Sequence, residues 1–512
     1  MNEAARDGAA GEAKDSPPET RTSNAVLTED VRKLVLRLGL PVMIGFVFAT
    51  LLSMADRFFV SLLPAGETAL AAVGCAFALD LIVIALGSGL SQGTASSVAR
   101  QIGAGHYDRA RRAGAQALLI ALLLAVLLAA GSFLAAPLMG LIAATPQVHV
   151  AATEYATVMM LGAAGWLAIS AFSGILRGEG DTKTPMKANL LAIVLNLILN
   201  PLFIFDFGLG LGVFGAALAT VVARMLAAAL LLLHLTRSSK TSLGRGVFLL
   251  RVNGPLVRDI LKVSLPSSCV TLFAAVNLLV VLWLLGDIAG EVGQAAFLIG
   301  YLFDQFAFLP VIGLAVGLTT VVGQNHGAGL YARERAAIRW CATYAVAICL
   351  GWLIVYLVAA PWLVGIYTTG EVPAAVHSTA TEFLRINAFS LPFIAVMATV
   401  SATFSGRGRG MPGLLLQALR MFGIGLPLFF ALQPWGLPWF WLALPISALL
   451  GAAVSVLWLR ATLAADPREM AAEEMAEEDA GLSPAADEPA QDERTASGRL
   501  LLPSTELPHR TV

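Results

Sequence analysis

Asp56 interrupts an otherwise apolar segment that ends near residue 61. A charged carboxylate deep in a membrane costs on the order of 2.5–3.5 kcal/mol, so such a side chain usually faces the protein interior and a partner. Burial favours the neutral carboxyl group, whereas a bound cation favours the carboxylate. This competition is the chemistry that a cation-coupled carrier needs. The alternative is an ion pair with Arg57, although adjacent residues point about 100° apart on a helix.

Two amides lie four residues apart in another apolar segment, at Asn196 and Asn200. Residues at positions i and i+4 share one helix face, so the pair can offer two carbonyl oxygens to Na⁺ or to a proton relay. The alternative is hydrogen bonding that only holds neighbouring helices together.

One acid and three aromatic residues form a stripe at 4-3-4 spacing, with Phe297, Tyr301, Asp304 and Phe308 on one helix face. Rings beside a carboxylate suit an amphipathic organic cation, through cation–π contacts and charge. Asp80 is expected to line the same path from the first half of the chain. In the alternative, the rings pack against lipid or a neighbouring helix and only Asp304 is functional.

Other chemistry is not indicated. The cysteines stand inside apolar segments without metal or disulfide spacing, at Cys75, Cys269, Cys341 and Cys349. We find no Ser–His–Asp order or nucleotide motif, and we expect no enzymatic activity, no cofactor and no nucleic-acid partner. Arg224 and Arg420 fall inside apolar segments, where each either neutralises a nearby acid or binds an anionic group of a substrate.

The elements that must position these residues are membrane-spanning helices. The 512-residue chain is 57% hydrophobic and 13% charged, with a mean hydropathy of +0.78, whereas soluble domains carry about 25% charged residues. Apolar periods and helix breakers predict an all-α polytopic membrane protein in contact with the lipid bilayer. The twelve predicted helices span 33–61, 69–98, 113–141, 151–176, 187–205, 213–236, 259–285, 294–322, 338–366, 378–404, 413–432 and 438–460.

Basic residues occur in every second connection between these helices. No Lys or Arg stands near 62–68, 142–150, 206–212, 286–293, 367–377 or 433–437. The other connections carry Arg100, Arg109, Arg111 and Arg112; Arg177, Lys183 and Lys187; Arg237, Lys240, Arg245, Arg251 and Arg258; Arg333 and Arg335; and Arg407 and Arg409. The positive-inside rule places this basic set, and with it both termini, in the cytoplasm. We expect a location in a bacterial inner membrane.

The two halves of the chain repeat at an offset of 224 residues. Residues 103–105 recur as 327–329, Asp80 falls on Asp304, and at an offset of 225 Pro41 falls on Pro266. Six helices in each copy make the copies parallel, as in many secondary transporters. The predicted parts are a disordered tail 1–32, an N-lobe 33–236, a linker 237–258, a C-lobe 259–460 and a disordered acidic tail 461–512. Pro41 and Pro266 are predicted hinges, with immobile kinks as the alternative.

From about residue 33 to 460 the order of these landmarks resembles the multidrug and toxic compound extrusion (MATE) family. The stretches that carry the resemblance are Leu40-Pro41, Ala55 to Val60, Gly103 to Gly105, Gly174 to Pro185, Asn196 to Ile204 and Gly215 to Thr220. The resemblance implies a V-shaped carrier of twelve helices in two lobes. It also implies export of organic, often cationic compounds in exchange for Na⁺ or H⁺.

The motifs are most similar to the prokaryotic DinF-like branch. That resemblance implies an ion site built from an acid on helix 1, an Asn and an Asp on helix 5 and a Thr on helix 6, and the matching positions are Asp56, Asn196, Asn200 and Thr220. Asn200 departs from the pattern, because the family often has Asp there. One carboxylate fewer favours H⁺ over Na⁺ as the coupling ion.

We therefore expect a secondary active antiporter for small organic, cationic compounds, acting as a monomer. The alternative is a flippase for a lipid-linked saccharide or another amphipathic lipid. Such relatives commonly have fourteen helices and a basic cavity, and twelve helices with acidic candidates argue against it.

Overall fold

The computed structural model describes residues 21–63, 66–237, 252–368 and 373–464, and this part of the chain folds into helices without a strand. The elements of the first half are α1 (Arg21–Thr28), α2 (Val31–Ser61), α3 (Gly66–Gly103), α4 (Tyr107–Gly131), η1 (Ser132–Leu134), α5 (Ala135–Ile142), α6 (Pro146–Leu161), α7 (Ala163–Glu179), α8 (Lys183–Ile204) and α9 (Gly212–Arg237). Those of the second half are α10 (Gly254–Gly327), α11 (Tyr331–Gly365), α12 (Ala374–Asn387), η3 (Ala388–Ser390), α13 (Leu391–Gly406), α14 (Gly410–Ala418), η4 (Leu419–Gly425), α15 (Leu426–Leu432), η5 (Gln433–Trp435) and α16 (Leu437–Ala464).

The helices confirm the predicted membrane-spanning architecture. Within the described residues, ten helical stretches are long and apolar enough to cross a membrane, and the bent pair α6 and α7 adds an eleventh. The 74-residue α10 is broken at Gly290, which has φ 58° and ψ −149°, and therefore contains two spans. The prediction of a loop over residues 286–293 is wrong in its extent, because the chain is helical on both sides of Gly290. Glycine adopts a positive φ at no steric cost, so one residue is enough to turn the chain.

Large apolar side chains cover the outside of the bundle. Phe133 is 86% exposed, Leu141 83% and Trp362 72%. Apolar surface on this scale is costly in water and favourable in a bilayer, where helices satisfy their own backbone hydrogen bonds. The chain is therefore a multi-pass membrane protein.

The helix α1 lies within the segment predicted to be a disordered tail. Val26 is fully buried, and the Arg333 side chain donates to the carbonyl oxygen of Glu29 at 2.7 Å. Asp30 then caps α2 by accepting from the Arg32 N–H at 2.9 Å. The prediction of disorder is wrong for residues 21–32, because long-range contacts order a locally polar sequence. Residues 1–20, most of the predicted linker (238–251) and the tail from 465 lie outside the described residues.

The sequence repeat is also a repeat of backbone conformation. Six of the glycines with positive φ stand at matching points of the two halves, in the pairs Gly105 (74°) and Gly329 (73°), Gly180 (93°) and Gly408 (80°), and Gly212 (57°) and Gly436 (98°). The members of each pair are 224 or 228 residues apart. Both halves therefore turn the chain in the same way at matching points.

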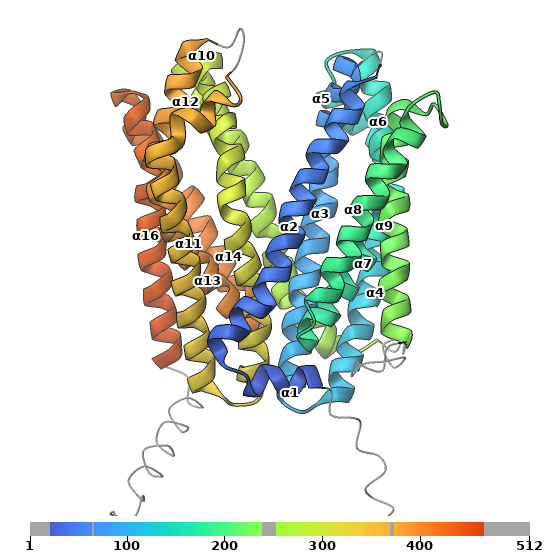
Figure 1. Ribbon diagram of the computed structural model, residues 1–512, viewed down its shortest axis with the longest axis vertical. Helices are drawn as coiled ribbons and strands as arrows, with labels where there is room; N and C mark the ends of the chain where they lie inside the picture. Colours follow the sequence, from blue (N-terminus) through green and yellow to red (C-terminus); the bar gives the residue numbers. More distant parts are fainter. Residues whose placement is uncertain (1–20, 64–65, 238–251, 369–372, 465–512) are drawn as a thin grey trace, which may run out of the picture. The chain divides into compact units, whose positions relative to one another are not determined.

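The hydrophobic core of the second half contains the beginning of α2, and two hydrophobic cores of the first half contain the beginning of α10. Leu34 and Leu38 of α2 belong to the core that holds Phe383 and Trp441 of the second half. Conversely, Ile260 of α10 belongs to a core of the first half. In Figure 1, α2 accordingly runs obliquely from the α11 and α13 side of the bundle towards the α8 and α9 side.

Each first helix thus begins in the core of the other half, an arrangement that we call the helix exchange. Glycines lie where these exchanged helix segments contact the other half. A Cβ atom at Gly89 of α3 would lie 2.1 Å from Ser268 Oγ of α10, and one at Gly93 would lie 2.1 Å from Ser264 Oγ. In the other half, a Cβ at Gly313 of α10 would lie 2.7 Å from the backbone nitrogen of Met43.

In the matching contact, a Cβ atom at Gly317 of α10 would lie 2.9 Å from the backbone nitrogen of Gly39 in α2. The two sets of contacts are related by the repeat offset, and Pro41 and Pro266 each lie midway along the segment that contacts the glycines. The predicted hinges are therefore placed where each first helix passes from one core to the other.

We predict that Gly89→Ala destabilises the protein, because the added methyl group meets the backbone and side chains of α10. Overpacking of this kind costs about 1–3 kcal/mol, which should lower the apparent melting temperature in detergent. Gly74 lies on the same helix with open space around it, so Gly74→Ala should leave stability unchanged or raise it, because alanine is the better helix former. Equal melting temperatures of the two variants would contradict the close contact.

Candidate functional site

Asp56 lies five residues before the end of α2 and faces α8. Its Oδ1 accepts a hydrogen bond from Asn200 Nδ2 at 2.5 Å. Asn200 also donates to Asn196 Oδ1 at 3.1 Å, so the two amides share one face of α8, as their i, i+4 spacing predicted. Asn196 and Asn200 are buried, and Asn200 Oδ1 has no hydrogen-bond partner among the described residues. The site therefore retains one open acceptor beside the carboxyl group.

Thr220 of α9 completes this group, which we call the N-lobe site: Asp56, Asn196, Asn200 and Thr220. Asn196 Nδ2 donates to Thr220 Oγ1 at 2.9 Å, and the hydroxyl donates to the carbonyl oxygen of Ala216 at 3.1 Å. Rotation of the Asn196 amide by 180° gives a second arrangement. Its nitrogen then lies 2.7 Å from Asp56 Oδ1, and its oxygen accepts from Thr220 Oγ1 at 2.9 Å. Three helices thus supply one continuous chain of polar groups.

A second charged group lies close to the N-lobe site. Arg224 Nη1 of α9 is 3.7 Å from Asp80 Oδ1 of α3, and the same guanidinium lies 5.2 Å from the ring centroid of Trp166. Arg57 lies over the ring of Phe77 at 5.8 Å.

The partner of Asp80 was not identified from the sequence, although both charges stand in apolar segments. Buried ions of opposite sign usually pair, so the presence of both charges in apolar segments could have predicted this ion pair. The sequence predicts Asp80 as a residue of the substrate path, and in the structure it pairs with Arg224.

Asp304 of α10 is buried in the C-lobe in a different setting. Asn387 Nδ2 of α12 donates to Asp304 Oδ2, and Ser390 Oγ donates to Asn387 Oδ1 at 2.8 Å. The other oxygen, Oδ1, is buried without a hydrogen-bond partner among the described residues. Asp304 thus has an amide partner where its repeat equivalent Asp80 has a cation. Sequence reasoning did not find Asn387 or Ser390, because they lie more than eighty residues away from Asp304.

The aromatic stripe divides into buried and half-buried residues. The ring of Phe297 stacks on Trp441 at 6.1 Å between centroids and meets Phe383 edge-on at 5.3 Å. Phe297 is buried, whereas Tyr301 and Phe308 are half-buried at the border of the same core. Phe297 is therefore a packing residue in this structure, and Tyr301 and Phe308 keep accessible ring surface.

Comparison with known proteins agrees with this architecture. The MatE family model matches residues 41–202 and 266–430, which is more than half of the chain. The "Probable multidrug resistance protein NorM" of Thermotoga maritima is 27% identical over 408 residues, covering 79% of this chain and 86% of that protein. The "FAD transporter" of Shewanella oneidensis is 29% identical over 324 residues, covering 62% and 70%. A crystal structure of a MATE protein in complex with MaL6 superimposes with a TM-score of 0.82 at 29% identity, covering 87% of this chain and 99% of that one.

We predict that Asn200→Asp creates a Na⁺-responsive site. A second carboxylate would stand within hydrogen-bonding distance of Asp56, and two such charges favour a bound cation between them. Replacing choline chloride by NaCl at constant ionic strength should then raise the melting temperature of the variant by on the order of a few degrees, and that of the wild type by much less. The control is Asn189→Asp, which adds the same charge to the same helix. An equal response of all three proteins would contradict the prediction.

Proposed function

The chain belongs to the MATE family, and from this premise we propose that it is a secondary active exporter that exchanges a cation for a small organic compound by alternating access. The observation that carries the proposal is the hydrogen-bonded N-lobe site, in which one carboxyl group meets two buried amides and a hydroxyl. Such a site can gain or lose one cation without catalysis of any covalent step. The proposed cycle needs no cofactor besides the coupling ion.

We infer that H⁺ is the preferred coupling ion. The N-lobe site contains a single carboxyl group, and the nearby acid Asp80 is paired with Arg224. A proton needs one basic atom, whereas Na⁺ needs several oxygens and benefits from more negative charge. Binding of Na⁺ by Asp56, Asn196 and Asn200 is the alternative.

Asn196 connects the acid to α9, because its amide is hydrogen-bonded to both Asn200 and Thr220. A change in the charge of Asp56, which accepts from Asn200, would therefore alter the hydrogen bonds between α8 and α9.

Alternating access requires a barrier that can open, and polar contacts between the halves supply one at the end of the bundle that contains α1 (Figure 1). Arg100 Nη2 of α3 donates to both carboxylate oxygens of Asp259 on α10 at 2.7 Å, and Ser97 donates to the same acid at 2.6 Å. Further contacts join Ser96 to Ser405, Gln92 to Thr319 and Gln324 to Gly178. We call this set the polar seam.

We propose that the polar seam closes the cytoplasmic side. The positive-inside rule places the basic loops at this end in the cytoplasm, together with both termini. The protein would then be open for export from the opposite side when the seam is closed, in a bacterial inner membrane. Pro41 and Pro266 would be the hinges on which the first helices bend when the seam opens.

The substrate proposed is a small organic cation bound by a monomer. Support comes from Asp304, which is buried without a cationic partner among the described residues, and from the half-buried rings of Tyr301 and Phe308. Asp80 has its cation already and is a weaker candidate for a substrate contact. A lipid-linked saccharide is not favoured, because the named relatives are a multidrug resistance protein and an FAD transporter.

We predict that Asp56→Asn reduces ion-driven export of an organic cation such as ethidium by at least about tenfold, because an amide cannot exchange a proton. Uptake into everted membrane vesicles under a pH gradient, without added Na⁺, measures this effect. Asp206→Asn, which removes an exposed acid from the turn after α8, is the matched control. Undiminished transport by Asp56→Asn would remove this residue from the mechanism, and transport that requires Na⁺ would contradict H⁺ coupling.

We predict that Asp259→Asn opens the polar seam more often, because it leaves the largely buried Arg100 without its charged partner. Thr319→Cys, placed in a chain whose native cysteines are replaced by serine, reports the opening. In everted vesicles, a membrane-impermeant maleimide should label this cysteine several-fold faster in the presence of Asp259→Asn. Asp108→Asn breaks an exposed ion pair with Arg111 and should not change the rate. Unchanged labelling in Asp259→Asn would exclude the ion pair as a barrier.

A further inference from the structure

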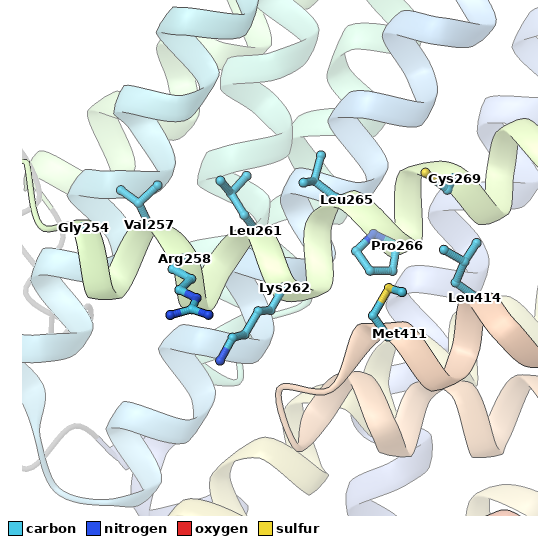
Figure 2. A pocket seen from close by; sticks show the side chains of 10 residues that line it. All are labelled: Gly254, Val257, Arg258, Leu261, Lys262, Leu265, Pro266, Cys269, Met411 and Leu414. Carbon is cyan, nitrogen blue, oxygen red and sulfur yellow. The ribbon is translucent and has the colours of Figure 1, made fainter.

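A groove lies between the beginning of α10 and the short helix α14, outside the N-lobe site and the polar seam. It encloses about 490 Å³, and apart from Arg258 and Lys262 its lining residues are uncharged and mostly apolar. Figure 2 shows Leu261 and Leu265 along α10, with Met411 and Leu414 facing Pro266 from α14. Leu265 and Met411 are more than half exposed. The groove is therefore open towards the surroundings of the bundle, which in a membrane-spanning protein is lipid.

Two cations line the same groove. Arg258 and Lys262 are one helical turn apart, are exposed and extend in the same direction from α10 (Figure 2). Among the described residues, neither has a hydrogen bond or an ion pair. Asp259, which follows Arg258, does not neutralise them, because it binds Arg100 and Ser97 in the polar seam. The N-terminus of α10 at Gly254 also lines the groove and adds the positive end of the helix dipole.

We propose that this groove binds an anionic phospholipid. The phosphate lies between Arg258 and Lys262, and one acyl chain follows the apolar surface formed by Leu261, Leu265 and Leu414. Basic residues at the membrane interface attract anionic headgroups, and an apolar groove open to lipid lets the acyl chain of the same molecule stay out of water. A free inorganic anion would leave the apolar surface uncovered. A zwitterionic lipid offers the same phosphate but adds a cationic group, which Arg258 and Lys262 would repel.

The position of the groove gives the lipid a structural consequence. The same stretch of α10 carries Asp259 of the polar seam and the buried Pro266, whose ring is 3.2 Å from the Cβ position of Gly410 in α14. The protein holds this stretch on one side through Arg100, and the lipid holds it on the other. This binding does not depend on the proposed transport activity and can be measured without it.

Native mass spectrometry of the full chain, released from detergent, tests the proposal. Phosphatidylglycerol and phosphatidylcholine with identical acyl chains are titrated onto the delipidated protein. Wild type should bind the first phosphatidylglycerol at least about tenfold more tightly than phosphatidylcholine, and Arg258→Gln/Lys262→Gln should lose that preference. The double variant changes only exposed side chains, and an unchanged melting temperature in detergent alone shows that it is folded.

The matched control is Lys183→Gln/Lys187→Gln, which removes two exposed cations at the same spacing from the beginning of α8. It should keep the preference for phosphatidylglycerol. Equal loss in both double variants, or no loss in Arg258→Gln/Lys262→Gln, would overturn the proposal. Inorganic phosphate should not displace the bound lipid at millimolar concentration, and displacement would show that the site takes a free anion instead. Cys269→Trp, which fills the groove and leaves both charges in place, should weaken binding, and unaltered binding would exclude the acyl-chain contact.

Discussion

The reciprocal exchange of the first helices is the constraint on which the rest of the structure depends. The beginning of α2 packs in the core of the second half, and the beginning of α10 packs in a core of the first half. Gly89 of α3 lets the beginning of α10 approach, and Gly313 of α10 lets the beginning of α2 approach. In both places a Cβ atom on the glycine would overlap the approaching helix. Small residues are the usual means of close helix contact in a membrane, where the hydrophobic effect does not drive helices together. Neither half can therefore move without displacing a helix that belongs to the other.

Both first helices connect this exchange to a chemically important residue. In α2, Gly39 lies in the exchanged segment and Asp56 lies beyond Pro41, in contact with α8. In α10, Asp259 of the polar seam precedes Pro266. The N-lobe site thus stands on a helix whose other end is held by the second half. Under the proposed function, this helix would be the rigid element through which a change at the ion site reaches the second half.

The duplicated scaffold holds different chemistry in its two halves. Asp80 and Asp304 occupy equivalent positions, yet Asp80 pairs with Arg224 while Asp304 accepts from Asn387 and keeps one oxygen unpaired among the described residues. An acid beside a cation is compensated within the protein, whereas an acid beside an amide remains available to a proton or a cationic ligand. The repeat therefore determines where an acid stands, and its neighbours determine what that acid can do.

The sequence by itself determined the membrane class, the twelve spans, the duplication and the candidate acids. These depend on local apolar periodicity and on charge, which act over a few turns of helix. The resemblance to a family added Thr220 to Asp56, Asn196 and Asn200, and the structure places these four side chains in one hydrogen-bonded group. Only the tertiary structure decided that Arg224 faces Asp80, that Asn387 faces Asp304 and that Phe297 is enclosed by Trp441 and Phe383. It also decided the exchange of the first helices between the two halves and the helical structure of residues 21–28. Partners so far apart in the chain meet according to which helix faces pack together, and that depends on the close fit of whole helices rather than on any local pattern.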